Sequence, residues 1–515
     1  MTYLPVIQFN YLFMDDYAFV KTDADHEKSL YEEIIDRSRD GKLIYGIFLH
    51  AISNYIKYDN LIRLLGIIGL SFLSFVIYAF LGIYQIKKIH AFIISILVCT
   101  LPSFQLFVAW MVTFPYIYSA ILSFTAGLIL FKVLSNKDNG GLRHQASSFF
   151  IIIVLLVTAL HIYQPTAMFY WAMGIIPLLV LKDEDFKDGW RLPFIAFFLT
   201  GVVSLAIYFL SVKILHHIFS VGFPGRGKLI AITNIPLKLN WFIHCPFNYA
   251  LNLWNIFPTY KIAGVVGIII IGIFLSNFLQ VLKKEKWRSL LWNHCQKIIL
   301  IIIILFLSYL PNLLIVDNIP VYRTLVSLET AICFLLYFGF VSLSDFFRFI
   351  PGFSPHIKDR AITTFLLILA VIAIYHSHNN INDFAILQTN ELKYVKSAIS
   401  KYGISQLSNI SEIYIRRPDE KKIIEKGFLY DEFGKPTSSF RWGAPHVVRV
   451  ALHDLGIKSD IIGNIKITQV ASDESIQEGK NILVIDMTKF DFLSNYKSSI
   501  TTPQRYCLTL PQRLK

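Results

Sequence analysis

Charged side chains are scarce in this sequence. Asp, Glu, Lys and Arg make up only 16% of the 515 residues, hydrophobic residues make up 55%, and the mean hydropathy is +0.54. Soluble globular proteins carry about 25% charged residues, so the composition excludes that class. Several apolar runs reach about 18 residues or more, which is enough to cross a bilayer. The sequence therefore predicts an α-helical polytopic membrane protein.

Cysteine is also sparse, and its pattern is uninformative. The five cysteines are scattered at Cys99, Cys245, Cys295, Cys333 and Cys507. No CxxC pair or other ligand spacing is present, so the pattern indicates neither a disulfide framework nor a zinc site. The N-terminus lacks a basic region followed by an apolar core and a small-residue cleavage site, so we expect no cleavable signal peptide.

The apolar runs predict ten complete membrane spans. They are residues 62–84, 89–110, 115–134, 148–163, 165–181, 193–215, 261–282, 298–316, 323–345 and 361–377. Residues 1–13 are apolar but too short to span. They form either an interfacial segment or the outer half of an eleventh helix, and we favour the second.

Basic residues gather in every second connection between these spans. The basic connections include Lys87-Lys88 and Lys283-Lys284, whereas the short connections near residues 112–116, 161–166 and 316–322 carry no Lys or Arg. The positive-inside rule places the basic set in the cytoplasm. Cytoplasmic loops therefore account for the net charge of +13, and no nucleic-acid partner is expected. Outer loops 14–60 and 216–260 would then lie in the periplasm.

The chain divides into two predicted domains. Residues 1–378 form the transmembrane domain, and the more charged residues 379–515 form a small C-terminal α+β domain on the periplasmic face. Residues 410–415 and 481–485 read as short strands. Residues 447–455 carry a helical period that ends at Gly456.

Asp15 and Asp16 form an acidic pair at the start of outer loop 14–60. Adjacent carboxylates repel each other, so one of them should resist ionisation. A carboxylate with a raised pKa is a candidate general base. A solvated loop start is the plain alternative. The other acids of this loop, among them Glu33, read as solvated positions on one or two short interfacial helices.

Two residues of the late span 323–345 stand out. Arg323 is the only basic residue at the outer end of this span, and an arginine binds phosphate oxygens with two parallel hydrogen bonds. Snorkelling to ordinary lipid headgroups is the alternative. Glu329, two turns into the span, is an intramembrane acid and so a functional candidate, unless it only pairs with a polar neighbour.

Outer loop 216–260 combines basic and aromatic residues. Arg226 and Lys228 lie in a Gly/Pro-rich stretch that suits a lipid phosphate, and Trp241 could stack on a sugar ring. An interfacial re-entrant loop is the alternative. The pair His216-His217 has no third metal ligand near it in sequence, so a metal site is not expected there.

A tight outer turn contains His161 and Gln164, which could donate hydrogen bonds to a sugar, although we favour a Pro-broken helical hairpin as the explanation. In the tail, residues 430–442 form a polar, aromatic, turn-rich patch that is compatible with glycan binding or with plain turns.

This combination resembles a known group. The early pair Asp15-Asp16, about ten to eleven spans, the outer Arg323 and a periplasmic C-terminal domain resemble the GT-C superfamily of polyprenyl-phosphate-sugar-dependent glycosyltransferases. Within that superfamily, the size and layout look most like the Gtr-type serotype-converting glucosyltransferases of enteric bacteria and their phages.

The resemblance implies an inverting transfer of a sugar, expected to be glucose, from undecaprenyl phosphate to lipid-linked O-antigen at the bacterial inner membrane. Asp15 or Asp16 would act as the base, and Arg323, with Arg226 and Lys228, would bind the donor phosphate. His161, Gln164, Glu329 and Trp241 would contact the acceptor sugar. No cofactor is expected, although a divalent cation at Asp15 and Asp16 is an alternative. A functional link to a flippase and to a donor-making glycosyltransferase is also expected.

Two other functions are alternatives. A transporter or flippase of lipid-linked sugars should carry charges deep within several spans or show repeat symmetry, whereas these spans are nearly free of charge. An O-antigen polymerase or ligase would be expected to rely on a large arginine-bearing outer loop. Both fit the sequence less well than a glycosyltransferase.

Overall fold

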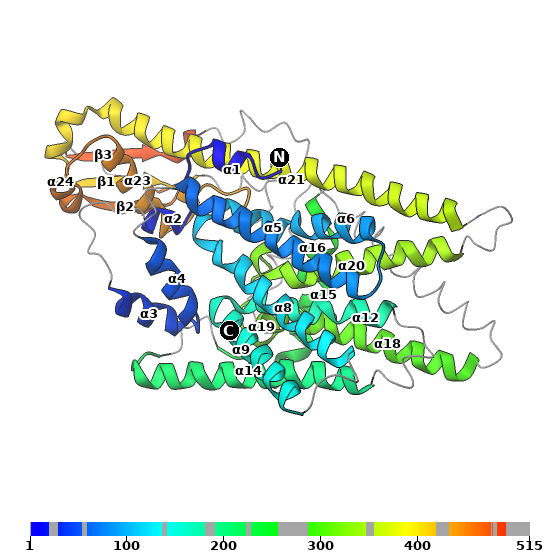
Figure 1. The fold of residues 1–515 in the computed structure, drawn as a ribbon. Helices are drawn as coiled ribbons and strands as arrows, with labels where there is room; N and C mark the ends of the chain where they lie inside the picture. The colour runs from blue at the N-terminus through cyan, green and yellow to red at the C-terminus, as the bar shows by residue number, and fades with distance from the viewer. Residues whose placement is uncertain are drawn as a thin grey trace.

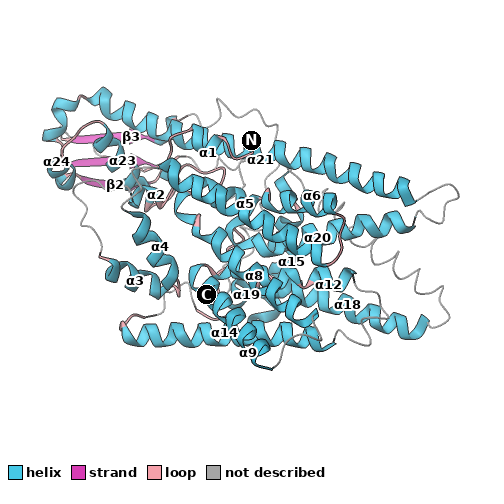
Figure 2. Ribbon diagram, in the orientation of Figure 1, coloured by secondary structure: helices cyan, strands magenta, loops and turns pink. Residues whose placement is uncertain are grey.

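The computed structural model describes residues 2–19, 29–53, 59–135, 142–180, 191–222, 228–255, 287–346, 355–418, 432–474, 476 and 481–490. Helices run roughly side by side through most of the molecule, and all strands of the described residues lie together at one end (Figures 1 and 2). This end also holds the short helices α2, α3 and α4, whose bounds are Asp16–Phe19, Leu30–Arg39 and Leu43–Ser53.

The bundle consists of long helices and of shorter, interrupted ones. The long helices are α5 (Asp59–Ile83), α8 (Pro115–Ser135), α9 (Leu142–Ile162), α14 (Arg191–Ile218), α18 (Trp287–Leu307), α20 (Tyr322–Phe346) and α21 (Pro355–Tyr402). The shorter ones are α1 (Pro5–Gln8), α6 (Lys88–Cys99), α7 (Pro102–Ala109), α10 (Gln164–Ala167), α11 (Phe169–Met173), α12 (Ile175–Val180), α15 (Ile235–His244), α16 (Pro246–Leu251) and α19 (Leu310–Leu314).

Five helices of the described residues are long and apolar enough to cross a membrane, or six if a bent pair counts as one span. They match the predicted spans that begin at residues 62, 115, 148, 193 and 323, and the bent pair α6–α7 matches the span 89–110. The predicted span 261–282 lies outside the described residues. The apolar helices indicate a membrane protein, and its described residues contain fewer uninterrupted spans than the hydropathy pattern predicts.

Proline explains where the predicted spans are broken. Its ring fixes φ and removes a hydrogen-bond donor, so it is accommodated in the first turn of a helix and not in its interior. Pro102 opens α7 after a 59° bend, and Pro165 and Pro311 stand in the first turns of α10 and α19. Hydropathy alone counts each such stretch as one continuous span.

The central helix of the bundle is α20. In its apolar window, 83% of the residues are buried, against 33% for α14, which lies at the edge of the bundle. Helix α20 packs against α7, α10, α11 and α16. Arg323, the second residue of α20, is therefore positioned at the end of the element that the other helices surround.

Residues 2–14 do not form half of a transmembrane helix. They make the single short helix α1 and then an extended stretch whose side chains Tyr11 and Phe13 are buried. The fully buried Arg63 of α5 donates hydrogen bonds to the carbonyl oxygens of Val6 and Tyr11. Because a buried guanidinium must be paired, Arg63 fixes this segment inside the bundle.

The C-terminal domain is built on a small parallel sheet. Its strands are β1 (Glu412–Arg416), β2 (Lys466–Val470) and β3 (Ile482–Asp486), in the order β2-β1-β3. Glu412 pairs with Lys466 on one side and with Ile482 on the other. The two strands predicted from sequence correspond to β1 and β3, and α23 (Gly443–Asp454) corresponds to the predicted helix.

Strand β2 was missed, and the sheet is parallel, so the domain is of the α/β type and not α+β. Parallel strands need a crossover connection, and α23 and α24 (Ser459–Asn464) supply it between β1 and β2. The expected domain boundary at residue 378 falls inside the 48-residue helix α21, which runs unbroken from the bundle into this domain (Figure 1).

Candidate active site

The two adjacent aspartates have different environments. Asp16 is fully buried at the start of α2. Its carboxylate accepts hydrogen bonds from the backbone N–H groups of Phe13 (3.1 Å), Met111 (3.4 Å) and Val112 (3.0 Å). Asp16 therefore ties the N-terminal segment to the short 3₁₀ turn η1 (Met111–Thr113) that precedes α8. A carboxylate used in this way is an anchor.

Asp15 is partly exposed and lies among positively charged side chains. Burial raises the pKa of its carboxyl group, and the charges of Arg323, Arg37, Lys42 and His446 act in the opposite direction. The predicted resistance to ionisation is thus confirmed for Asp15, but its largest cause is burial and not repulsion by Asp16. A raised pKa makes a carboxylate a better proton acceptor.

The backbone in front of Asp15 is strained. Met14 has φ +47°, a left-handed conformation that is uncommon for a residue with a Cβ. Its buried N–H donates to the Thr437 hydroxyl at 3.1 Å, so the C-terminal domain holds this conformation in place. Strain that is held by tertiary contacts is typical of functional sites.

Arg323 lies at the same site as Asp15. Its Nε is 3.1 Å from Oε1 of the buried Glu432, and its guanidinium carbon is 5.2 Å from the centroid of the Trp110 ring. Its side chain remains 31% exposed, so part of the guanidinium is accessible. The structure thus brings together two of the residues that the sequence singled out 308 positions apart, at Asp15 and Arg323.

Two further cations at this site, Arg37 and Lys42, were not predicted. The Nε of Arg37, in α3, is 2.8 Å from Oε1 of Glu33. The sequence predicted that Glu33 is solvated, but it is buried. The Nζ of Lys42, in the turn between α3 and α4, lies 5.1 Å from the centre of the Tyr163 ring. Tyr163 stacks on Tyr116 at 3.8 Å. The sequence signal for these two cations is that both lie in loop 14–60, the same loop that carries Asp15.

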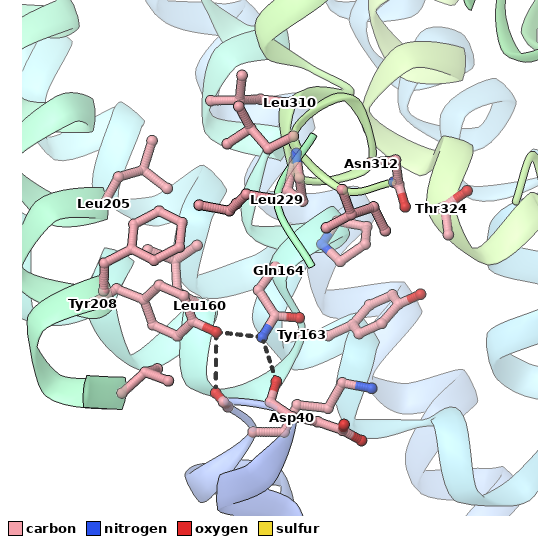
Figure 3. A pocket seen from close by; sticks show the side chains of 18 of the residues that line it. Asp40, Leu160, Tyr163, Gln164, Leu205, Tyr208, Leu229, Leu310, Asn312 and Thr324 are labelled. Carbon is pink, nitrogen blue, oxygen red and sulfur yellow. Dashed lines mark hydrogen bonds between the residues drawn. The ribbon is translucent and has the colours of Figure 1, made fainter. Parts of the chain in front are cut away.

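A pocket of about 330 Å³ lies beside this cluster. It is lined by the turn 39–42, by the end of α9 and start of α10, by one face of α14, and by segments around residues 229, 310–319 and 324. Lys42 and Thr324, the neighbour of Arg323, belong to this lining. Figure 3 shows Leu205, Leu229 and Leu310 away from the polar end that Asp40 marks.

His161 and Gln164 hold the polar end of this pocket. The ring of His161 hydrogen-bonds the Gly41 carbonyl oxygen (3.2 Å) and the Ser211 hydroxyl (2.8 Å). The Gln164 amide donates to the Asp40 carbonyl oxygen (3.2 Å) and to the Tyr208 hydroxyl (Figure 3). Gln164 lines the pocket, whereas His161 is buried and contributes through the turn that it supports.

Glu329 and Trp241 lie in the interior. Glu329 is buried and accepts hydrogen bonds from the Ser103 hydroxyl (2.7 Å) and, at 3.4 Å, from its backbone N–H. It thereby stabilises the first turn of α7 after the α6–α7 bend. Trp241 of α15 is buried against Tyr309, with the Lys238 ammonium 4.2 Å from its ring centre. Neither placement tests the predicted sugar contacts.

The remaining predicted residues lie in or next to outer loop 216–260. Arg226 falls outside the described residues. Lys228 is exposed and precedes Leu229 of the pocket lining, and its carbonyl oxygen accepts a hydrogen bond from the Val316 N–H at 2.9 Å. His216 Nε2 bonds the Ser38 carbonyl oxygen at 3.0 Å.

No group of three or more His, Cys, Asp or Glu side chains within the described ranges could hold a metal ion. The basic residues around Asp15 also make a poor environment for a divalent cation, because like charges repel. A cation at Asp15 and Asp16 stays a prediction.

Comparison with known proteins identifies the family to which this chain belongs. Residues 43–344, more than half of the chain, match the family model described as "Glucosyl transferase GtrII". The chain belongs to the GtrII glucosyltransferase family. The resemblance to Gtr-type glucosyltransferases is thereby confirmed. No curated protein and no solved structure matched the chain.

The GtrII match covers only part of the site. It includes Arg323, Gln164 and most of the pocket, but Asp15, Arg37 and Lys42 precede it, and the C-terminal domain follows it. The roles of those residues therefore depend on the geometry of this chain and not on the family match.

Proposed function

We propose that this GtrII family member is an inverting glycosyltransferase of the bacterial inner membrane. It moves glucose from undecaprenyl phosphate to an O-antigen or related lipid-linked glycan on the periplasmic side, where the C-terminal domain also lies. The family match supports glucosyl transfer, and the apolar helices support a membrane location. The lipid donor, the acceptor and the side of the membrane are proposals.

The reaction is a single displacement. An acceptor hydroxyl oxygen attacks the anomeric carbon, the bond from that carbon to the phosphate oxygen breaks, and its electron pair leaves with the lipid phosphate. Asp15 takes the proton of the hydroxyl. Arg323 and Lys42 neutralise the charge that develops on the phosphate, which is the electrostatic stabilisation that most enzymes rely on. Attack from the face opposite the phosphate inverts the anomeric centre.

One observation supports this proposal above the others. A partly exposed carboxylate with a raised pKa and three basic side chains, Arg323, Arg37 and Lys42, meet beside a largely apolar pocket. A base next to cations is the arrangement that proton removal and phosphate departure require together. A flippase would have no use for a base at this position.

The test uses the full-length protein in lipid nanodiscs with glucosyl undecaprenyl phosphate and a lipid-linked oligosaccharide. Mass analysis should show a gain of one hexose on the acceptor. We expect Asp15→Asn to lower kcat by about 10²- to 10⁴-fold, the usual contribution of a general base, with normal expression and unfolding temperature.

Asp16→Asn is the matched control for that experiment. It removes one acceptor oxygen from buried backbone N–H groups and should therefore lower the stability by about 1–3 kcal/mol. Full activity of Asp15→Asn would refute the catalytic assignment. Movement of the donor across the membrane without transfer would favour a transporter, and a change in glycan chain length would favour a polymerase.

A further inference from the structure

A buried acid of α20 contacts a serine of α7. The Oγ of Ser103 lies 2.7 Å from Oε2 of Glu329, and both side chains are buried. The same Oγ lies 2.6 Å from the carbonyl oxygen of Tyr322, the first residue of α20. Ser103 belongs to the first turn of α7. Its hydroxyl group therefore bridges two points that are about two turns apart on α20.

This bridge lacks a hydrogen unless Glu329 supplies one. A hydroxyl group carries a single hydrogen, and a carbonyl oxygen can only accept. If Ser103 donates to the Tyr322 carbonyl oxygen, its contact with Glu329 needs a hydrogen from the carboxyl group. If Ser103 donates to Glu329 instead, two oxygens face each other at 2.6 Å with no hydrogen between them. Only the neutral carboxylic acid satisfies both contacts.

The surroundings of Glu329 also favour its neutral form. Within the described residues, the polar partner of its carboxyl group is Ser103, and no basic side chain pairs with it. A buried charge without a partner is costly, so a carboxyl group in this position keeps its proton. The free thiol of Cys333, one turn further along α20, is buried too, and a thiol cannot supply a compensating positive charge.

Helix α7 connects this bridge to the candidate site. Its first turn carries Ser103, and the residue that follows its end is Trp110, whose ring centre is 5.2 Å from the guanidinium carbon of Arg323. Arg323 also follows Tyr322, whose carbonyl oxygen belongs to the bridge. The backbone and the guanidinium group of Arg323 are therefore positioned from the two ends of one helix.

We propose that Glu329, in its protonated form, is a positioning residue for Arg323. Its hydrogen completes the bridge through Ser103, and the bridge fixes the first turn of α20 against α7, so that the guanidinium group faces the site. The inference rests on the proposed function, in which Arg323 neutralises the leaving phosphate. Glu329 itself then contacts no substrate, in contrast to the sugar contact that the sequence suggested.

Two substitutions of similar length separate the hydrogen bond from the packing. Glu329→Gln keeps a donor that can reach Ser103, whereas Glu329→Met fills the space without one. In the nanodisc transfer assay, Glu329→Gln should stay within about twofold of the wild type, and Glu329→Met should lower kcat about 10²-fold, the scale of a displacement by about 1 Å. A Glu329→Gln variant as inactive as Glu329→Met would overturn the inference.

Ser103→Ala removes the other half of the bridge and should lower kcat as Glu329→Met does. Thr330→Val is the matched control on α20. The Thr330 hydroxyl is buried, but it donates to the Val326 carbonyl oxygen of its own helix at 2.8 Å. Its loss should therefore leave kcat unchanged. An equal loss of kcat in Thr330→Val and Ser103→Ala would overturn the inference, because any buried hydroxyl would then have the same effect.

A double-mutant cycle shows whether Glu329 acts through Arg323. Substitutions of residues that act as a unit are not additive. Glu329→Met should therefore cause little further loss of kcat when Arg323 is already replaced by glutamine. A full second loss in the Arg323→Gln background would mean that Glu329 acts elsewhere, and it would overturn the inference.

Two measurements are independent of activity. The infrared difference spectrum of wild type minus Glu329→Gln at neutral pH should contain the carbonyl band of a protonated carboxylic acid, and carboxylate bands in its place would overturn the inference. Amide hydrogen exchange at residues 322–326 should be faster in Glu329→Met and in Ser103→Ala than in the wild type. Unchanged exchange in both variants would overturn it as well. If both expectations are met but the wild type transfers no glucose, the proposed function fails, and the positioning of Arg323 by Glu329 stands.

Discussion

At the scale of single residues, Asp15 and Asp16 are adjacent and chemically identical but have different roles. The carboxylate of Asp16 accepts hydrogen bonds from three backbone N–H groups. Asp15 instead faces the cations of three different elements. The cause is local geometry. The left-handed Met14 turns the chain, so that one carboxylate points into the core and the other toward the site.

The pKa of Asp15 makes the pH dependence of the reaction testable. Asp15 must be ionised to accept a proton, so kcat/KM should fall on the acid side at a pH above the ordinary aspartate range. Arg37 lowers this pKa, so Arg37→Gln should raise it further and move the acid limb to higher pH. The measurement is the pH profile of kcat/KM in nanodiscs.

Lys466→Gln serves as the control for Arg37→Gln. Lys466 is paired with Glu412 on the C-terminal sheet, so the same loss of one charge there should leave the profile unchanged. An acid limb that stays in place or moves to lower pH in Arg37→Gln would contradict the assignment of Asp15 as the base.

At the scale of elements, the turn between α3 and α4 shapes the pocket. Gly41 has φ +70°, and a Cβ added to it would lie 2.3 Å from the Tyr208 hydroxyl oxygen. The same hydroxyl donates to the Gly41 carbonyl oxygen at 3.3 Å. The close approach therefore requires glycine both for its backbone conformation and for its missing side chain.

Gly41→Ala should displace Tyr208 and open the polar end of the pocket. We expect a loss of about 1–3 kcal/mol in unfolding free energy from the strained backbone and the broken contacts, together with a raised KM for the donor. Gly82→Ala is the control, because nothing lies within 4 Å of a Cβ added there. Equal donor KM values for the two variants would show that the turn does not shape the site.

At the scale of the whole molecule, the C-terminal domain completes the site. Glu432 holds Arg323, and Thr437 holds the backbone before Asp15. The loop that carries Thr437 is fixed in turn by the buried Glu391 of α21, whose two oxygens accept the N–H groups of Thr437 (2.8 Å) and Ser438 (2.7 Å). Helix α21 thus connects the helix bundle to the loop that carries Thr437 and, through Thr437, to the backbone that precedes Asp15.

Glu391→Gln should loosen this connection. A glutamine turns one acceptor oxygen into a donor facing a backbone N–H, which costs about 1–3 kcal/mol. We expect a lower kcat, since Asp15 loses its support, and faster tryptic release of the C-terminal domain. Glu412→Gln, which removes the charge that Lys466 and the Tyr414 hydroxyl contact on the C-terminal sheet, should change neither quantity. If both variants behaved alike, the domain would not support the site through Glu391.

Local patterns made part of this structure predictable. Composition determined a membrane protein, the apolar runs located α5, α8, α9, α14 and α20, and β1 and β3 were predicted as short strands, β3 from an apolar run with polar flanks. The breaks at Pro102 and Pro311 and strand β2 were missed, because hydropathy averages over a kink and because β2 carries a mixed pattern, Lys-Ile-Thr-Gln-Val.

By itself, the sequence determined the class of the protein and, through Asp15 and Arg323, two residues of the candidate site. Only the tertiary structure decided that Asp15 is the accessible carboxylate, that Lys42 and Arg37 join it, and that Glu432 and Thr437 support the site from more than 400 positions away from Asp15. The physical reason is that composition and periodicity record what each segment buries, whereas a site depends on which buried segments meet.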